Sequence, residues 1–434
     1  MNIIFYEDEN YTQFYPITLT KPVHELMCGS MPVYKRILKT FQKKYPEKNF
    51  KVCFLTRNLV FDVLKDKNYY KETEKIKIEE DVLFINSRLL YSNELAEQNF
   101  TEEFSFFIEN NLSGFFIKSE NARKKGFYIN PVAYNGFNDK QKDFILSLDK
   151  KNISGKIVNY LWDLVNAMPE VMALDFSSLN VSGKRKPESK GKFHKTSVIY
   201  GDENLFFCNI NSEIYPHAVI DTKNGPVIID ESAEIHPFSR IEGPTYIGKS
   251  AIVLGAKIRS GTFIGEKCRV GGEIENSIIH GNSNKYHDGF LGHSYIGEWV
   301  NLGALTTNSD LKNNYSEVSV QIEGKTTHTG ISKVGCFIGD HSKTSIGCLF
   351  NTGTYIGVMA NVLATSGLLP KYIPSFSNYM NGKFARSFPL SSLFETANIV
   401  KARRNEKFTE AETKLFTTIY KNSETERKKL TVRR

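Results

Sequence analysis

The second half of the chain carries an aliphatic residue at every sixth position. The series begins at Ile229, Ile235, Ile241, Ile247 and Val253, and it then shifts by one position. Its later members are Ile252, Ile258, Ile264, Val270, Ile296, Leu302, Ile338, Phe350, Ile356 and Val362, with the polar Thr344 as an exception. A period of six fits neither the 3.6-residue period of a helix nor the alternation of a hairpin strand. It predicts short flat strands joined by tight turns, three to each coil of a solenoid, whose stacked coils bury the aliphatic residues.

Glycine follows several of these aliphatic residues, for example at Gly248, Gly265 and Gly357. We expect these glycines at the turns, where a residue without a Cβ atom accepts a positive φ. The signature of an aliphatic residue, glycine and four further residues resembles the left-handed parallel β-helix family. This resemblance implies the handedness, which periodicity alone does not reveal.

Residues 280–295 and 307–332 interrupt the repeat with polar, charged and aromatic residues. A regular stack can accommodate such insertions only as loops. Because loops on a rigid scaffold are common places for binding and catalysis, we expect a site there.

The first half has a different pattern. Apolar runs at 2–6, 51–56 and 82–90 alternate with helix-like stretches at 31–45 and 143–176. This alternation predicts an α/β domain with a mostly parallel sheet. We therefore expect an α/β domain over residues 1–182, a basic linker over 183–197, a β-helix over 198–376 and a helical extension over 377–434. Spaced apolar residues in the extension, Leu393, Ile399, Phe408 and Leu415, predict amphipathic helices that cap the last coil.

Composition narrows the class of protein. The net charge of +8 is concentrated in residues 183–195 and 426–434, and no nucleic-acid-binding motif accompanies it, so we expect no nucleic-acid partner. Neither a signal peptide nor an apolar run long enough to span a membrane is present, and the six cysteines are scattered. We expect a cytoplasmic protein without a membrane partner.

Residues 14–37, FYPITLTKPVHELMCGSMPVYKRI, resemble the opening of sugar-1-phosphate nucleotidyltransferases. Pro16, Ile17, Thr18 and Pro22 keep the skeleton of that motif. Its charged and glycine-rich parts differ, since residues 7–13 read EDENYTQ and Val23 stands where the family has lysine; Asn86 and Ser87 stand where a Gly-Asp metal site is expected. Nucleotidyl transfer with Mg²⁺ would therefore depend on other groups, such as Lys21, Arg88 and Asp81.

Phrases in the second half of the chain, among them NGPVIID, IEGPTYIG, SNKYHDGFLGHSYIGEWVNLGALTTNSDLKNNYS and FNTGTYIG, resemble a GlmU-like family of sugar nucleotidyltransferases. The resemblance extends over practically the whole chain, but it is specific in the second half and weak in the first. Its bifunctional relatives acetylate glucosamine 1-phosphate and then uridylylate it. The resemblance implies an acetyl-CoA-dependent N-acyltransferase that acts on an amino-sugar phosphate or a UDP-sugar and works as a homotrimer.

YHDGFLG, residues 286–292, has the spacing of the family's Gly-His-Leu-Thr-Tyr-Leu-Gly run without its leading glycine. The resemblance makes His287 the catalytic base and puts Phe290 at the place of a substrate-contacting tyrosine. An imidazole, with an unperturbed pKa of ~6.5, can accept a proton from an amino-sugar nitrogen at neutral pH.

The same resemblance implies roles for further residues. Arg259 matches an arginine that binds the sugar phosphate, whereas the family's companion lysine is missing near Glu275. Either Lys285 substitutes for it, or the phosphate is held differently and the preferred sugar has changed. Asn301 is the expected sugar ligand, with Asn308 as a weaker one. The acyl donor would contact the backbone of Ala304, and Lys333 and Lys343 are the cations nearest to its phosphates.

Two other functions stay open. A γ-type carbonic anhydrase also has a trimeric β-helix and binds zinc through histidines, for which His287, His293 and His341 are available. Alternatively, the β-helix only trimerises a nucleotidyltransferase or a sugar-nucleotide-binding domain. As single loop histidines, His293 and His328 are expected to be exposed and without a role, and His341 is the reserve candidate for the base.

Overall fold

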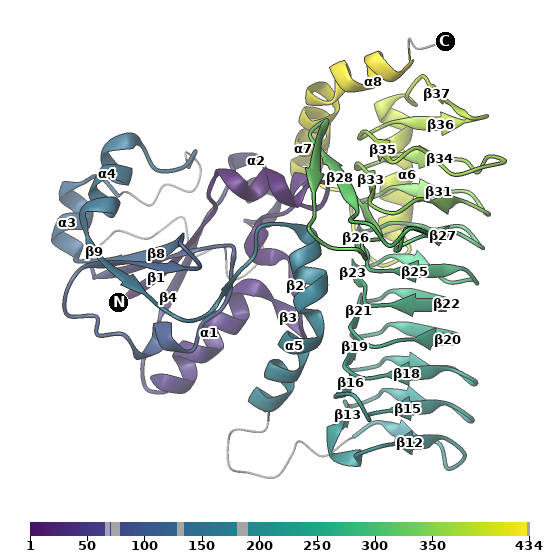
Figure 1. The fold of residues 1–434 in the computed structure, drawn as a ribbon, viewed down its shortest axis with the longest axis horizontal. Helices are drawn as coiled ribbons and strands as arrows, with labels where there is room; N and C mark the ends of the chain where they lie inside the picture. The colour runs from purple at the N-terminus through teal and green to yellow at the C-terminus, as the bar shows by residue number, and fades with distance from the viewer. Residues whose placement is uncertain (66–69, 71–78, 128–133, 180–189, 432–434) are drawn as a thin grey trace.

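The computed structural model describes residues 1–65, 70, 79–127, 134–179 and 190–431. It contains an N-terminal α/β domain, a stack of short strands and three C-terminal helices (Figure 1). The expected fold class is confirmed: an α/β domain precedes a left-handed parallel β-helix, and helices follow. Residues 183–189 of the expected linker lie outside the described residues.

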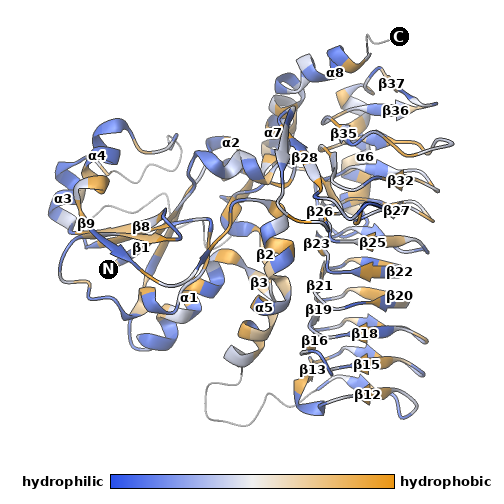
Figure 2. Cartoon of the chain, viewed as in Figure 1, coloured by the Kyte–Doolittle hydropathy of each residue, from blue (hydrophilic) through white to orange (hydrophobic). Residues whose placement is uncertain are grey.

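The N-terminal domain is built on a six-stranded mixed sheet. Its order is β4 (Lys51–Leu55), β1 (Asn2–Tyr6), β5 (Val82–Asn86), β8 (Asn111–Ile117), β7 (Phe104–Ile108) and β9 (Asp149–Asn152). The first three strands are parallel, as the sequence predicts, whereas β8 runs antiparallel to both of its neighbours. The β7–β8 pairing has a local cause: only two residues separate these strands, too few for the crossover that a parallel pair requires. In Figure 2 the central strands are mostly apolar, as expected for a sheet buried on both faces.

The helices of this domain are α1 (Val33–Lys44), α2 (Asn58–Leu64), α3 (Ser119–Lys124), α4 (Asp139–Ser147) and α5 (Leu161–Leu179), and short pairs join β2 (Met27–Cys28) to β3 (Met31–Pro32) and β6 (Leu89–Tyr91) to β10 (Lys156–Ile157). Helix α5 lies between the domain and the β-helix (Figure 1). Its apolar residues share one core with Phe263, Tyr295 and Phe337 on the outside of the β-helix. Burial of this surface holds the two parts together.

The β-helix has three faces. The first contains β11 (Lys192–Phe193), β14 (Glu213–Ile214), β17 (Glu234–Ile235), the starts of β20 (Ile252–Ile258) and β22 (Arg269–Glu275), β24 (Asn284–Lys285), β31 (Lys343–Thr344), β34 (Asn361–Val362) and β36 (Asn378–Met380). The second contains β12 (Val198–Tyr200), β15 (Val219–Asp221), β18 (Arg240–Glu242), the ends of β20 and β22, β25 (Phe290–Gly292), β27 (Thr307–Asn308) and β32 (Leu349–Phe350).

The third face is a nine-stranded parallel sheet that faces the N-terminal domain. It contains β13 (Phe206–Cys208), β16 (Val227–Ile229), β19 (Thr245–Ile247), β21 (Thr262–Glu266), β23 (Ile278–Gly281), β26 (Tyr295–Glu298), β30 (Cys336–Ile338), β33 (Thr354–Ile356) and β35 (Tyr372–Ile373). The hairpin of β28 (Ser319–Ile322) and β29 (Lys325–His328) leaves the stack within one of the expected interruptions.

The residues of the six-residue series point into the stack, except for Ile252, which is half-buried beside the inward Val253. Ile229, Ile247 and Ile264 are consecutive partners in the register of the third face, and all three are fully buried. The glycines after them have a different role from the expected one. Gly248 and Gly265 do not have positive φ; a Cβ atom on Gly265 would lie 1.8 Å from the carbonyl oxygen of His280 on the next coil. Close backbone approach between coils, and not a left-handed turn, requires these glycines.

The C-terminal helices are α6 (Leu390–Ala402), α7 (Glu410–Asn422) and α8 (Glu424–Thr431). Helix α8 contacts β37 (Lys383–Ala385), the antiparallel partner of β36 near the end of the stack. Helix α7 contacts α2, and Leu415, Phe416 and Ile419 share a core with residues of the N-terminal domain. These helices therefore join the two parts of the molecule as well as covering the last coils.

Candidate functional site

The loop that carries His287 is a corner between the first and second faces. Six positions separate the inward residues Lys285 and Leu291 across this corner. The two preceding corners are shorter, with five positions from Val253 to Ile258 and four from Val270 to Ile274. The shift in the six-residue series is thus a shortened corner. A full-length corner at 286–289 therefore stands out beyond the coil before it.

Gly271 and Gly272 allow this close stacking. A Cβ atom on Gly271 would lie 2.3 Å from the carbonyl oxygen of Tyr286. Gly272 has a φ of +69°, and its Cβ atom would lie 2.6 Å from the carbonyl oxygen of Gly289 and 2.9 Å from Nζ of Lys285. The loop that carries His287 therefore packs against the shortened corner of Gly271 and Gly272.

His287 is exposed at the tip of this corner, with its ring edge-on to Tyr286. Its carbonyl oxygen accepts a hydrogen bond of 2.9 Å from Nζ of Lys285. The backbone of the loop is therefore held from below, and the imidazole is left free to meet a ligand.

Lys285 occupies an inward position, in register with Val270, and is only 2% exposed. Its ammonium group donates to the carbonyl oxygens of Gly271, at 3.1 Å, and His287. Burial lowers the pKa of Lys285 to about 8, against the opposing effect of Asp288. Its amine supports the loop from inside the solenoid and does not project from the surface.

Phe290 and Arg259 lie on the outer side of the second face, two coils apart. The guanidinium of Arg259 lies 2.9 Å from the Glu275 carboxylate and 3.5 Å from that of Glu273. These acids already balance the positive charge of Arg259, the residue that was expected to bind the sugar phosphate. Only movement of this ion pair would free Arg259 to bind an anion.

Asn301 is on the outer side of the first face, paired with Asn284 on one coil and Lys343 on another. The next corner, which contains Ala304, stacks directly on the His287 loop, because the amide of Leu305 donates to the carbonyl oxygen of Asp288 at 2.8 Å. The structure therefore places His287 and Phe290 on one coil and Asn301 and Ala304 on the next, with Asn301 on the first face and Phe290 on the second.

Asn308 is separate from this group. It is 2% exposed, points inward, and its amide bonds both the N–H and the C=O of Gly292, at 2.9 and 3.0 Å. These contacts replace backbone ladder bonds between coils. Lys333 is exposed at the edge of the long interruption, where it pairs with Leu311.

A histidine that the sequence led us to set aside has the best-defined contact. Nδ1 of His293 lies 2.7 Å from Oδ2 of Asp310, and the side chains are 10% and 14% exposed. Burial raises the pKa of Asp310, but the hydrogen bond and the charge of His293 together have the larger effect. The pKa of Asp310 is therefore lower than its usual value. The sequence did contain a signal for this contact, namely the spacing of the two residues. Asp310 follows His293 by 17 positions, and the same number separates Asn284 from Asn301, its partner on the next coil.

His328 and His341 lie in opposite environments. His328 is exposed on the hairpin, as expected. His341, the reserve candidate, is buried against Trp299, Phe408 and Phe416, and burial holds its pKa well below the usual value. Across the described residues, no cluster of three metal-ligating side chains occurs within this one chain, and no helix is long and apolar enough to cross a membrane.

In the N-terminal domain, the acidic loop binds its own chain. Glu7 accepts hydrogen bonds from the amide of Val23, the hydroxyl of Thr56 and the guanidinium of Arg57. Asp8 lies 2.8 Å from Arg88. Lys21 and Asp81, the other groups expected to substitute for the missing motif, are paired with Asp340 and Lys118.

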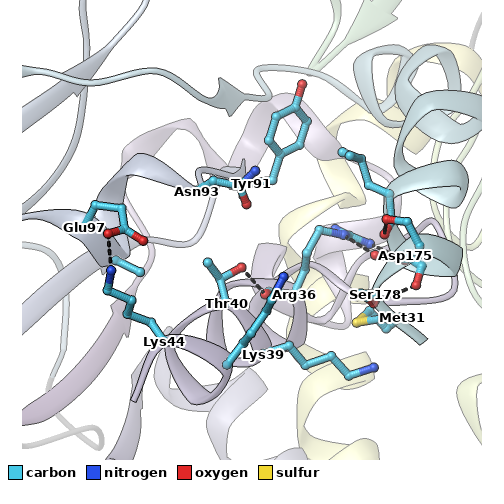
Figure 3. A pocket seen from close by; sticks show the side chains of 14 residues that line it. Met31, Arg36, Lys39, Thr40, Lys44, Tyr91, Asn93, Glu97, Asp175 and Ser178 are labelled. Carbon is cyan, nitrogen blue, oxygen red and sulfur yellow. Dashed lines mark hydrogen bonds and ion pairs between the residues drawn. The ribbon is translucent and has the colours of Figure 1, made fainter. Parts of the chain in front are cut away.

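A separate cavity of about 370 Å³ lies between α1 and α5 on the outside of this domain (Figure 3). Two ion pairs, Arg36 with Asp175 and Lys44 with Glu97, contribute to its walls. Its lining includes none of the expected site residues.

Residues 3–183 match the family model described as "Sugar nucleotidyl transferase". A bifunctional sugar-1-phosphate nucleotidylyltransferase/acetyltransferase of Sulfurisphaera tokodaii is 29% identical over 234 residues, which are 51% of this chain and 54% of that relative. The chain thus matches about half the length of that protein. The bifunctional protein GlmU of Methanococcus aeolicus is 25% identical over 406 residues, which cover 80% of this chain and 89% of that protein.

Among solved structures, the UDP-N-acetylglucosamine acyltransferase from Campylobacter jejuni aligns with 55% of this chain and 94% of its own, at 12% identity and a TM-score of 0.30. The family model and the sequence relatives agree with the order of domains described above. Residues 3–183 thus resemble the sugar nucleotidyl transferase family, and the chain is similar over most of its length to a bifunctional GlmU protein; in this chain the N-terminal α/β domain precedes a left-handed parallel β-helix.

Proposed function

We propose that the protein is an acyltransferase that transfers an acetyl group from acetyl-CoA to the amino group of a phosphorylated or nucleotide-linked amino sugar. The observation that carries this proposal is the exposed imidazole of His287 on a loop supported from below by Lys285 and stacked against the corner of Ala304. The name of the Sulfurisphaera tokodaii relative, which includes an acetyltransferase, supports the same reaction class.

In the proposed reaction, the neutral amino group of the sugar attacks the thioester carbonyl carbon with its lone pair, and the C–N bond forms. His287 accepts the proton that the nitrogen loses as this bond forms. The tetrahedral intermediate collapses with cleavage of the C–S bond, and the thiolate of coenzyme A takes up the proton that His287 holds. Backbone N–H groups at the neighbouring corners are the available donors for the oxyanion.

The neighbours of His287 have matching roles in this proposal. Phe290 offers an apolar wall without a hydroxyl, and the side-chain amides of Asn284 and Asn301 offer donors and acceptors to sugar hydroxyls. Ala304 presents backbone to the acyl donor. We also propose a homotrimer, in which a second copy of the chain closes the exposed side of the loop.

The second candidate function is nucleotidyl transfer by the N-terminal domain, and the match of residues 3–183 favours it. The charged side chains at the ends of β1 and β5 do not fit a magnesium site as they stand. Both oxygens of Asp8 contact Arg88, and the Glu7 carboxylate is occupied by Val23, Thr56 and Arg57. We therefore derive no metal-dependent step; binding of a sugar nucleotide without turnover is the alternative role.

The test is release of free thiol from acetyl-CoA in the presence of a panel of amino-sugar phosphates and UDP-amino sugars. His287→Ala is expected to abolish release with an active substrate and to leave the oligomer intact. The matched control is His328→Ala, which removes an exposed histidine from the hairpin. Undiminished thiol release by His287→Ala would disprove the assignment of the base. Incubation with each nucleoside triphosphate and a sugar 1-phosphate, followed by a pyrophosphate assay, tests the second function.

A further inference from the structure

A small pocket lies under the end of α6, against the first face of the β-helix. Four cationic side chains line it, namely Arg269, Lys343, Arg403 and Arg404, together with Asn282, Asn284, Asn301 and the apolar residues Trp299, Val300 and Val400. No carboxylate is among its lining residues. We call the group of four cations the basic pocket.

The charges of the basic pocket are not balanced from within. None of its four cations forms an ion pair with a carboxylate in the described part of the chain. Burial, together with the positive charges of Arg269 and Arg403, lowers the pKa of Arg404. Arg403 caps α6, but a helix C-terminus supplies only about half a negative charge.

A neighbouring pocket shows the opposite arrangement. It shares Asn282 and Trp299 with the basic pocket, and its two lysines are each paired with an acid. Lys21 lies 2.6 Å from Asp340, and Lys401 lies 2.6 Å from Glu412. The chain therefore places counter-charges next to cations in one pocket and omits them in the next.

Unpaired polar atoms in the lining are a second indication that the basic pocket holds a ligand. The Oδ1 atoms of Asn282 and Asn284 are buried and have no hydrogen-bond partner among the described residues. Buried polar atoms are nearly always paired, and rotation of an asparagine amide exchanges its acceptor for donors. Lys343 donates to the carbonyl oxygen of His341 at 3.1 Å and keeps two further N–H groups for a ligand.

We propose that the basic pocket binds the phosphoryl or diphosphoryl end of a ligand with at least two negative charges. Guanidinium groups form paired hydrogen bonds to phosphate oxygens, and three arginines surround this space. The cavity volume is about 160 Å³, below the ~300 Å³ of pockets that enclose a whole small molecule. The rest of the ligand therefore extends along the first face.

A ligand that extends from the basic pocket along the first face would approach the loop that carries His287. Asn284 lines the pocket, and His287 follows it by three residues on the same coil. At ~3.3 Å per residue for a fully extended chain, the two backbones are at most about 10 Å apart. The inference itself rests on the unbalanced charges and does not require acyl transfer to occur.

The experiment is calorimetric titration of the full chain with inorganic pyrophosphate, coenzyme A, glucosamine 1-phosphate and UTP. Pyrophosphate is expected to bind the wild type. The double variant Arg403→Gln/Arg404→Gln is expected to bind it about tenfold more weakly or worse, because charge-assisted hydrogen bonds are lost. Arg404→Lys, which keeps the charge, should retain much of the affinity.

The matched control is Arg240→Gln, which removes an arginine that is paired with Asp221 and Glu242 elsewhere on the β-helix. It should bind pyrophosphate as the wild type does. His287→Ala should also bind normally, so failure of the acyl-transfer proposal and failure of this one are distinguishable. Circular dichroism and thermal unfolding confirm that each variant is folded.

The four probes separate the sources of the phosphoryl group. If coenzyme A binds more tightly than pyrophosphate and depends on the two arginines, the ligand is the acyl donor; the same result with glucosamine 1-phosphate or UTP assigns it to the sugar or nucleotide substrate. Absence of pyrophosphate binding to the wild type, or binding that the folded double variant leaves unchanged, overturns the proposal.

Discussion

Nδ1 of His293 lies 2.7 Å from Oδ2 of Asp310, and the two residues occupy adjacent coils at the corner between the second and third faces. His293 also has a positive φ of 47°, and its carbonyl oxygen accepts from the amide of Gly335. The ion pair therefore fixes a strained corner to the segment that returns from the long interruption.

Replacement of Asp310 by asparagine should destabilise the protein by about 1–3 kcal/mol at pH 7, because a charge-assisted hydrogen bond is lost in a half-buried place. The pKa of Asp310 is lowered in the folded protein, so its contribution is present above the unfolded value of ~3.9 and is lost as pH falls through the folded pKa. Urea unfolding of both proteins between pH 7 and pH 3 checks this. An equal gap in unfolding free energy at both ends of that range would contradict the prediction.

Lys285→Met should leave stability at pH 7 unchanged or raise it by roughly 2 kcal/mol, because burial of an ammonium group disfavours the folded state. Burial lowers the pKa of Lys285 to about 8, whereas an unfolded lysine titrates near 10.4. The unfolded state thus holds the extra proton between these values, and the wild type gains stability relative to the variant as pH rises from 8 to 10.4. The same substitution should reduce acyl transfer, since the loop loses its support from Nζ. A pH-independent difference in stability would refute the pKa argument.

Asp340→Ala should destabilise the protein by about 3–5 kcal/mol, because it leaves the buried Lys21 ammonium with only the more distant carboxylate of Glu298, at 3.8 Å. Lys21 belongs to the N-terminal domain, and Nζ lies 2.6 Å from Asp340 of the β-helix. Burial lowers the pKa of Lys21, but the carboxylates of Asp340 and Glu298 raise it above its usual value. The double variant Lys21→Met/Asp340→Ala should recover part of the loss. Denaturant unfolding of the three variants gives the coupling energy, and a coupling near zero would argue against this ion pair.

Gly272→Ala should displace the His287 loop and reduce activity, with a loss of stability of about 1–3 kcal/mol. A Cβ atom there would lie 2.6 Å from the carbonyl oxygen of Gly289. Gly347→Ala is the matched control, because Gly347 lies at a later corner between the same two faces with the same φ of +69° and no atom within 4 Å of its added Cβ. Thermal unfolding and thiol release should show a larger effect for Gly272→Ala. Equal effects would mean that backbone conformation alone, and not contact with the loop, explains both.

The fold could be predicted from the sequence to a large extent. Residues six positions apart, such as Ile235 and Ile241, are both inward and fully buried, because a three-sided coil presents one residue of each short strand to the core. The sheet of the first domain was only partly predicted. Alternation of strands and helices indicates an α/β domain, but the antiparallel β8 depends on a tight connection that hydrophobic pattern does not reveal.

The candidate site was predicted less well, for a definite reason. The expectation of an irregular loop over 280–295 was wrong, because these residues form a regular coil that contains β24, β25 and parts of β23 and β26. The sequence did identify His287, at the corner of that coil, as the residue to test. It could not show that Lys285 and Asn308 point into the solenoid, that Arg259 is paired with two glutamates, or that Asp310 reaches His293. Those facts depend on the register between coils, in which shortened corners displace one coil's residues relative to the next.

By itself, the spacing of aliphatic residues determined that this chain stacks into a β-helix, since only that geometry buries every sixth side chain. Only the tertiary structure decided which polar residues are buried inside the stack and which are exposed on its outer surface. The physical reason is that the electrostatic state of a side chain depends on its neighbours in space, and those neighbours are brought close by coil length and by the docking of distant helices.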